Sequence, residues 1–283
     1  MPQAIAENTL FQGLPAILLR APDGAEATVL LHGAHLVSWK PAGDRERLYL
    51  SDKAVFEDGK PVRGGVPICF PQFGKNGPLP QHGFVRDRSW EIVTARAGDD
   101  FAMAMLRFTD SAETRAMWPH AFTAEFSVSI TGARLDMELE VTNTGDAPLG
   151  FTAALHTYMA VDEVEEAQLE GLRGQTYRDL LDGGTEHVES GTFVAIERET
   201  TRLYLETANP LLLREARKSL GINAENMPDT VVWNPWEVTC ATIGDLPANG
   251  FRRFLCVEAG AISQPVELAA DETWWGRQSL IAM

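Results

Sequence analysis

Hydrophobic and polar residues alternate along much of this chain. Residues 135–141 (LDMELEV) place an apolar side chain at every second position. A period of two predicts a β-strand with one buried and one exposed face. Similar short alternating segments occur at residues 27–32, 101–108 and 124–130, and we expect a strand at each.

Turn-forming residues separate these segments and favour a β-sandwich. Clusters of Gly, Pro, Asp and Asn begin at Pro41, Thr131 and Asn143. Helical patterns are scarce, and residues 211–220 fit a helix or a turn-rich β segment equally well. Turns spaced about 8 to 12 residues apart are typical of antiparallel sandwiches. We therefore predict a mainly β fold, a large antiparallel β-sandwich that forms a single domain over residues 1–283.

The composition and charge narrow the possible partners. Apolar residues make up 45% of the chain and charged residues 23%, close to the averages for globular proteins. The formal net charge of −16 disfavours nucleic acid, whose binding needs a basic surface. A small anionic substrate stays possible, because salt screens surface charges over about 8 Å and a few arginines can dominate a pocket. We expect a monomer that acts on a small molecule.

The cysteines and the N-terminus predict a cytoplasmic protein. Cys69, Cys240 and Cys256 each lie in an apolar stretch and form no Cys-x-x-Cys pair, which indicates buried thiols in a reducing compartment. The first 20 residues have no basic segment followed by a long apolar run, and no apolar stretch of 18 residues occurs. We expect no membrane association.

Residues 60–90 interrupt the alternation and combine many Gly and Pro residues with His, Arg and aromatic residues. Long loops of this kind in compact proteins are usually functional or disordered, and the interleaved aromatic residues argue against disorder. Arg63 and Arg86 offer planar donor groups suited to phosphate. Lys75 and Arg88 are weaker candidates. A single arginine is more often a solvated surface charge, but two in one such stretch favour a binding role.

Several histidines and one glutamate are further candidates. His32 and His35 lie in a Gly-containing turn, where packed histidines are the better explanation. His156 lies on an apolar strand pattern, where a lone histidine is more often a core residue. Glu258 follows the apolar run 254–257, so its carboxylate needs a partner or a polar pocket.

A histidine and a glutamate suit the exchange of sugar anomers. This reaction needs a base for the C1 hydroxyl and an acid for the ring oxygen, and burial and neighbouring charges can tune both groups toward neutrality. It requires no metal or redox cofactor, and we expect none. Other common site signatures are absent, including nucleotide-binding Gly-rich loops, the Gly-x-Ser-x-Gly turn and His-Glu-x-x-His. No histidine has the close sequence spacing to cysteine or carboxylate that is typical of zinc sites.

Seven segments, taken in order, resemble the hexose-6-phosphate branch of the aldose 1-epimerase superfamily. They are LHGAHLVSW (31–39), VRGGVPICFPQFG (62–74), PQHGFVRDRSWEI (80–92), LHTY (155–158), VVWNPW (231–236), VEAG (257–260) and PVELAADETWWGRQSL (265–280). RGGVPICFPQFG followed closely by QHGFVRD is the most specific part. The resemblance implies a galactose mutarotase-like supersandwich with its site in the concave face of one sheet, and an epimerase of hexose phosphates.

The resemblance also implies roles for individual residues. His156 would be the general acid at the ring oxygen, and Glu258 the general base at the C1 hydroxyl. Gln81 would bind the sugar, and His82 would donate a hydrogen bond to a ring hydroxyl or to the ring oxygen. Catalytic residues are thus expected at two places far apart in the sequence.

The remaining implied contacts concern phosphate and sugar specificity. Arg63 and Arg86 would contact the phosphate or the sugar. Relatives are expected to carry an aspartate in an E-x-D-R-x-Y segment, whereas this chain has ETTRLY at 199–204, with the uncharged Thr201 in its place. The preferred sugar therefore stays open. Two other functions also stay open: an epimerase of free aldoses, and a non-catalytic carbohydrate-binding or regulatory protein of the same fold.

Overall fold

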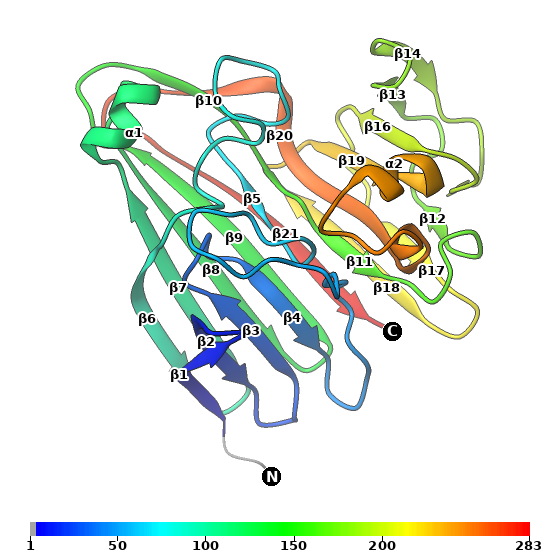
Figure 1. Ribbon diagram of the computed structural model, residues 1–283, viewed down its shortest axis with the longest axis horizontal. Helices are drawn as coiled ribbons and strands as arrows, with labels where there is room; N and C mark the ends of the chain where they lie inside the picture. Colours follow the sequence, from blue (N-terminus) through cyan, green and yellow to red (C-terminus); the bar gives the residue numbers. More distant parts are fainter. Residues whose placement is uncertain (1–3) are drawn as a thin grey trace.

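The computed structural model describes residues 4–283, which form three antiparallel sheets with little helix (Figure 1). A nine-stranded sheet forms one layer. Its strands in spatial order are β15 (Phe193–Ala195), β12 (Gln168–Glu170), β17 (Leu211–Arg214), β18 (Ser219–Glu225), β21 (Thr273–Ala282), β9 (Arg134–Asn143), β8 (Phe122–Thr131), β7 (Ala102–Thr109) and β6 (Glu91–Ala97). Side chains in β8 and β9 alternate between buried and partly exposed, as a period of two predicts.

Two further sheets pack against the nine-stranded sheet. A four-stranded sheet contacts β6, β7 and β8, and its strands are β1 (Ile5–Phe11), β2 (Leu14–Arg20), β3 (Glu26–Leu30) and β4 (Leu36–Lys40). The third sheet consists, in order, of β14 (Thr185–Val188), β13 (Thr176–Asp179), β16 (Thr200–Tyr204), β19 (Asp229–Asn234), β20 (Phe254–Leu268), β10 (Leu149–Leu155) and β5 (Ile68–Cys69), with β11 (Tyr158–Ala160) also paired to β20. Ile17, Phe126 and Val257 come from the three sheets and lie in one buried apolar cluster. The predicted antiparallel sandwich is confirmed.

The strands expected from alternation are all present. Segments 27–32, 101–108, 124–130 and 135–141 correspond to β3, β7, β8 and β9. The ambiguous segment 211–220 is not a helix but the hairpin of β17 and the start of β18. Leu211, Leu213 and Leu220 are buried, whereas Arg214 at the end of β17 and Arg217 in the turn are exposed.

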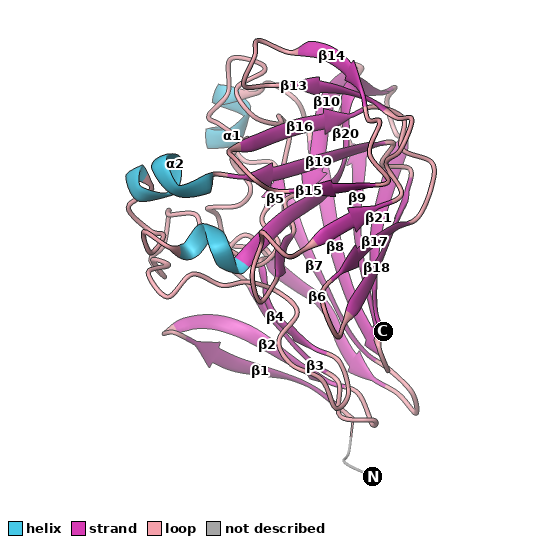
Figure 2. Cartoon of the chain, turned by 90° about the vertical axis from the view of Figure 1, so that its right-hand side faces the viewer, coloured by secondary structure: helices cyan, strands magenta, loops and turns pink. Residues whose placement is uncertain are grey.

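Helices are few and short, and the sequence did not predict them. They are α1 (Ala112–Met117), α2 (Trp236–Thr242) and a 3₁₀ turn (Gly250–Arg253), all at the periphery of the sheets (Figure 2). Within residues 4–283, no helix has the length and apolar character needed to cross a membrane.

Residues 60–90 form the long loop that the sequence predicted, interrupted only by the two-residue strand β5 and isolated bridges. Gly64 and Gly65 allow this loop to pass close to other backbone. A Cβ atom on Gly64 would lie 2.4 Å from the Tyr49 carbonyl oxygen, and one on Gly65 would lie 2.3 Å from the Leu36 carbonyl oxygen. Both residues also have positive φ angles, which favour glycine. The two glycines therefore fix the backbone position of the preceding Arg63.

The buried His35 side chain contacts Gly64 and Gly65. Its Nε2 lies 2.7 Å from the Gly64 carbonyl oxygen, to which it donates, and its side chain is buried. Burial lowers the pKa of His35 to about 4, and the bond to Gly64 only partly offsets this effect. His35 is a packed structural histidine, as the sequence indicated.

We predict that His35 makes the fold sensitive to acid. Its pKa is lower in the folded state than the ordinary 6.5, so the unfolded state binds more protons below pH 6.5. Neutral His35 makes its full contribution to the free energy of unfolding above pH 6.5. This contribution is lost as the pH falls toward 4. The loss amounts to about 3 kcal/mol at pH 4.

Urea unfolding at pH 7 and pH 4 checks this prediction with the wild type and His35→Gln. The variant should be less stable at pH 7, but it should lose less unfolding free energy between the two pH values. Equal losses in both proteins would show that His35 does not carry this acid sensitivity.

Candidate active site

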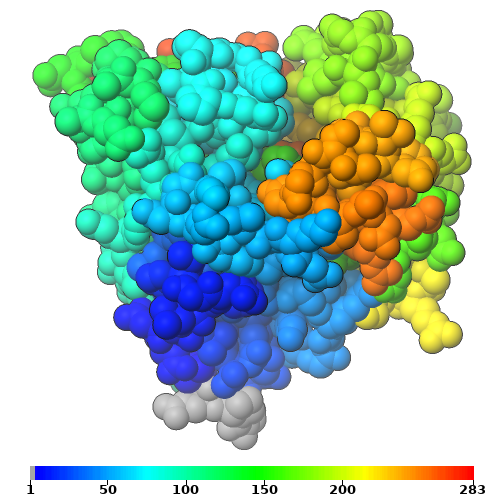
Figure 3. Space-filling view, viewed as in Figure 1, coloured from blue at the N-terminus to red at the C-terminus, as the bar shows by residue number. Residues whose placement is uncertain are grey.

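A cavity of about 380 Å³ opens beside the third sheet. In Figure 3 the surface is hollowed where the cyan, green and orange parts of the chain meet. The lining residues are Arg63, Phe73, Gly74, Gln81, His82, His156, Leu180, Thr201, Val231, Trp233, Ile243 and Glu258. Six of the seven residues expected at the site thus share one cavity, although they come from distant parts of the sequence.

Arg86 is the seventh expected residue and does not line the cavity. Its Nη2 donates to the carbonyl oxygen of Gln81, a lining residue, at 2.9 Å. The two weaker cationic candidates lie outside the site. Lys75 is exposed, and Arg88 forms a 2.8 Å ion pair with Glu113 at the surface.

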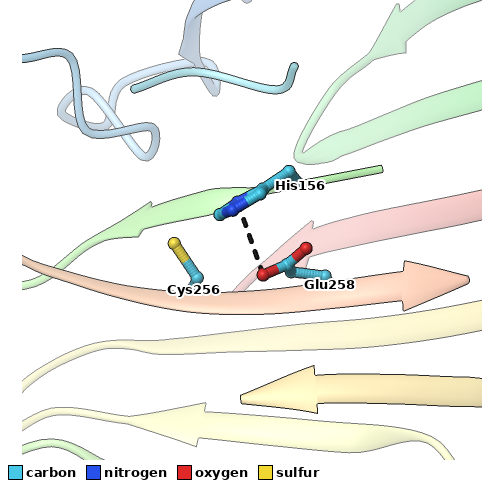
Figure 4. Close-up of side chains that lie close together, drawn as sticks. All are labelled: His156, Cys256 and Glu258. Carbon is cyan, nitrogen blue, oxygen red and sulfur yellow. Dashed lines mark ion pairs between the residues drawn. The ribbon is translucent and has the colours of Figure 1, made fainter. Parts of the chain in front are cut away.

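His156 and Glu258 face each other because of strand pairing. His156 lies at the junction of β10 and β11, and both of these strands pair with β20, which carries Glu258. The His156 Nδ1 and Glu258 Oε1 atoms are 3.4 Å apart (Figure 4). His156 is 8% exposed and Glu258 only 1%. The pair is shielded from bulk water at the base of the cavity.

Burial governs the charge state of this pair. It raises the pKa of Glu258 well above its ordinary value, an effect that Arg86 only partly offsets. It lowers the pKa of His156 well below 6.5, and the neighbouring His82, Arg86 and Arg63 side chains lower it further. Both groups therefore favour their neutral forms. Within residues 4–283, His156 Nδ1 and Glu258 Oε2 have no hydrogen-bond partner, which leaves both atoms available to a polar ligand.

Gln278 stabilises the positions of His156 and Glu258 from the opposite face of the sheet. This buried residue lies on β21, and its Nε2 donates to the Val257 carbonyl oxygen at 3.0 Å. The Thr157 hydroxyl donates to Gln278 Oε1. One side-chain amide thus links the residue after His156 to the residue before Glu258, and fixes the spacing of the two site residues.

Arg63 is held beside His156. Its Nε donates to Asp245 Oδ1 at 3.0 Å, and its Nη1 donates to the Tyr158 hydroxyl at 3.1 Å. The Tyr158 ring stacks on the His156 ring with centroids 4.9 Å apart. Arg63 therefore orients the ring that supports His156, and Asp245 already balances part of its charge.

His82 presents a hydrogen-bond donor to the cavity. Burial lowers its pKa to about 3, and nearby arginines contribute, so the ring is neutral at pH 7. The Gly74 amide donates to His82 Nδ1 at 3.3 Å. An accepting Nδ1 places the ring proton on Nε2. His82 can therefore donate a hydrogen bond from Nε2, and its contact with a sugar oxygen stays a prediction.

Residues 15–280 match the family model described as aldose 1-epimerase. The chain belongs to this family. It is 34% identical over 281 residues to a Cenchrus ciliaris protein, an alignment that covers 96% of this chain and 85% of that protein. It is 32% identical over 253 residues to an Escherichia coli protein, with 87% and 83% covered. Both relatives carry the provisional name glucose-6-phosphate 1-epimerase.

Solved structures agree with this assignment. A provisionally named mutarotase from Salmonella typhimurium superposes with a TM-score of 0.91 at 29% identity, covering 98% of this chain and 93% of that one. This aldose 1-epimerase is therefore an isomerase with a galactose mutarotase-like fold, and its substrate is a small carbohydrate.

The apolar wall of the epimerase cavity was missed by sequence reasoning. Trp233 pairs with Thr201 between β19 and β16. Its ring lies edge-on to the His156 ring, with the ring centroids 5.7 Å apart. Trp233 belongs to the VVWNPW segment, which could have indicated that this residue lies at the site. Leu180 and Ile243 line the same cavity from loops and belong to no motif.

A second missed feature is a group of possible metal ligands. Ligand atoms of His156, Cys256 and Glu258 all lie within 4.8 Å of one another. Sequence spacing gave no indication of this group, because about 100 residues separate the histidine from the other two. Cys256 lies on the same strand as Glu258, and the pairing of β11 with β20 brings His156 to both.

Proposed function

We propose that this aldose 1-epimerase interconverts the α and β anomers of a hexose 6-phosphate, with His156 as the general acid and Glu258 as the general base. The observation that carries this proposal is the buried His156–Glu258 pair at the base of a sugar-sized cavity. The names of the two relatives support the phosphorylated substrate.

Ring opening leaves the total number of protons on His156 and Glu258 unchanged, because one group gains a proton while the other loses one. The neutral pair becomes reactive when the Glu258 proton passes to His156 across the 3.4 Å between them, which leaves the number of bound protons unchanged. In this form the Glu258 carboxylate takes the proton from the C1 hydroxyl, while the His156 imidazolium gives a proton to the ring oxygen. The bond between C1 and the ring oxygen breaks, and the open-chain aldehyde rotates about C1–C2. Reversal of both transfers closes the ring on the other face. Ring opening leaves a neutral carboxylic acid and a neutral imidazole, and burial favours both forms.

Arg86 is the stronger candidate for the phosphate. The chain carries a net charge of −16, so a dianionic substrate must be captured by cations at contact distance. Among the ion pairs within residues 4–283, Arg86 forms none, and its Nη2 contacts only a carbonyl oxygen. Arg63 is already paired with Asp245, which favours a structural role beside the sugar ring.

A free aldose is the second candidate substrate. Arg86 does not line the cavity, and Arg63, the cation that does, is balanced by Asp245. A neutral sugar needs no further positive charge. The two substrates differ in their expected dependence on Arg86.

We further propose that the protein acts in the cytoplasm as a monomer, without nucleic acid or membrane partners. The three cysteines are free and buried, which suits a reducing compartment. The acidic net charge supports the absence of nucleic acid.

We predict that His156→Asn and Glu258→Gln each lower kcat by about 100-fold or more, because each removes one proton-transfer group. Exchange NMR on glucose 6-phosphate measures this effect, and circular dichroism verifies folding. Glu267→Gln is the matched control, since Glu267 is an exposed residue on the same strand. A folded His156→Asn or Glu258→Gln protein with near-wild-type kcat would show that the residue has another role.

We predict that Arg86→Ala weakens kcat/KM by about 10- to 150-fold more for glucose 6-phosphate than for glucose, the effect of one charge-assisted hydrogen bond. The loss should lie mainly in KM, because the phosphate is remote from C1. Arg63→Ala should slow both sugars, since it frees Tyr158 beside His156. Arg88→Ala serves as the surface control. Equal losses for both sugars in Arg86→Ala would favour the free aldose.

A further inference from the structure

We propose that His156, Cys256 and Glu258 form a binding site for a thiophilic divalent cation such as Zn²⁺, and that the bound ion inhibits the enzyme. The binding itself stands on the geometry of the three side chains. Only the inhibition rests on the proposed roles of His156 and Glu258.

Strand geometry directs all three side chains to one point. Cys256 and Glu258 are two residues apart on β20, so their side chains project from the same face of the sheet. The β10–β11 junction places His156 against the same face (Figure 4). The 3.4 Å between His156 Nδ1 and Glu258 Oε1 is close to the ~3.3 Å that separates two ligands on a tetrahedral zinc ion with bonds of ~2.0–2.1 Å.

The third ligand is also within reach. Cys256 Sγ belongs to a group in which every ligand atom lies within 4.8 Å of the others, so a small side-chain rotation completes the site. Three protein ligands leave the fourth tetrahedral position open to the cavity, where water can occupy it.

The charge balance favours such an ion in this buried position. A divalent cation with one thiolate and one carboxylate has no net charge, so the low-dielectric base of the cavity gains no unpaired charge. The ion also supplies a ligand bond to His156 Nδ1, which has no hydrogen-bond partner within residues 4–283. Binding would release two protons to solvent, one from the Cys256 thiol and one from the Glu258 carboxyl group.

The ligand types determine which ions bind and what binding does. Thiolate and imidazole select Zn²⁺ or Cd²⁺, whereas Mg²⁺ and Ca²⁺ prefer sites made only of oxygen. A coordinated His156 and Glu258 lose the lone pairs with which they accept protons. The ion therefore blocks proton transfer and acts as an inhibitor of the epimerase.

Titration with Cd²⁺ tests the site, because a cadmium–thiolate bond produces an ultraviolet charge-transfer band that does not depend on enzyme activity. We expect a saturable band from one ion per chain, with a parallel loss of anomer exchange. Cys256→Ser should retain anomer exchange and lose the band. Its inhibition should need more than about 100-fold more Cd²⁺, because losing a direct ligand costs more affinity than losing a residue that only contacts a ligand. Mg²⁺ should produce neither change.

Cys240→Ser is the matched control, because Cys240 is also buried but donates to the Pro247 carbonyl oxygen away from the site. It should behave as the wild type. Where Cys256→Ser does not fold, His156→Asn provides the test, since it removes a different ligand and should also weaken the band.

Three results would overturn the proposal: no band in the folded wild type, an unchanged band in Cys256→Ser, or a bound ion with unchanged anomer exchange. A wild type that shows the band but no anomer exchange without Cd²⁺ would overturn the proposed function, with the cation site retained.

Discussion

The pairing of β20 with both β10 and β11 is the constraint on which the site depends. His156 lies where β10 ends and β11 begins, so its position is fixed by two strand pairings at once. Glu258 lies on β20 itself. Gln278 from the nine-stranded sheet then joins the two segments from behind. The packing of two sheets therefore sets the distance between the proposed proton-transfer groups.

Burial has two consequences in this protein. It places the apolar faces of three sheets in one core, and it also removes water from around an acid and a base. In that environment a charge is costly, so His35, His82 and His156 all favour the neutral form. A sugar hydroxyl entering the cavity meets an acid and a base that burial holds in their neutral forms. The stability of the sandwich and the proposed chemistry thus depend on the same exclusion of water.

Local patterns predicted the strands, because β8 and β9 bury every second residue in the sequence itself. They were ambiguous at 211–220, where leucines on two short strands mimic a helical face. The site was predicted only through its resemblance to a family, since alternation cannot show that His156 lies opposite Glu258. Leu180, Ile243 and Cys256 were missed for the same reason. Each is an apolar or thiol residue with no motif of its own, and only the tertiary fold brings Leu180 and Ile243 to the cavity and Cys256 to His156.

The most direct test of the central claim is exchange NMR on freshly dissolved α-glucose 6-phosphate and α-glucose with the wild-type protein at neutral pH, in the presence of EDTA. We expect the protein to accelerate anomer exchange of glucose 6-phosphate, with a higher kcat/KM than for glucose, because the phosphate adds a cationic contact that glucose lacks. Acceleration of neither sugar by the folded protein would contradict the assignment of His156 and Glu258 as a competent acid–base pair.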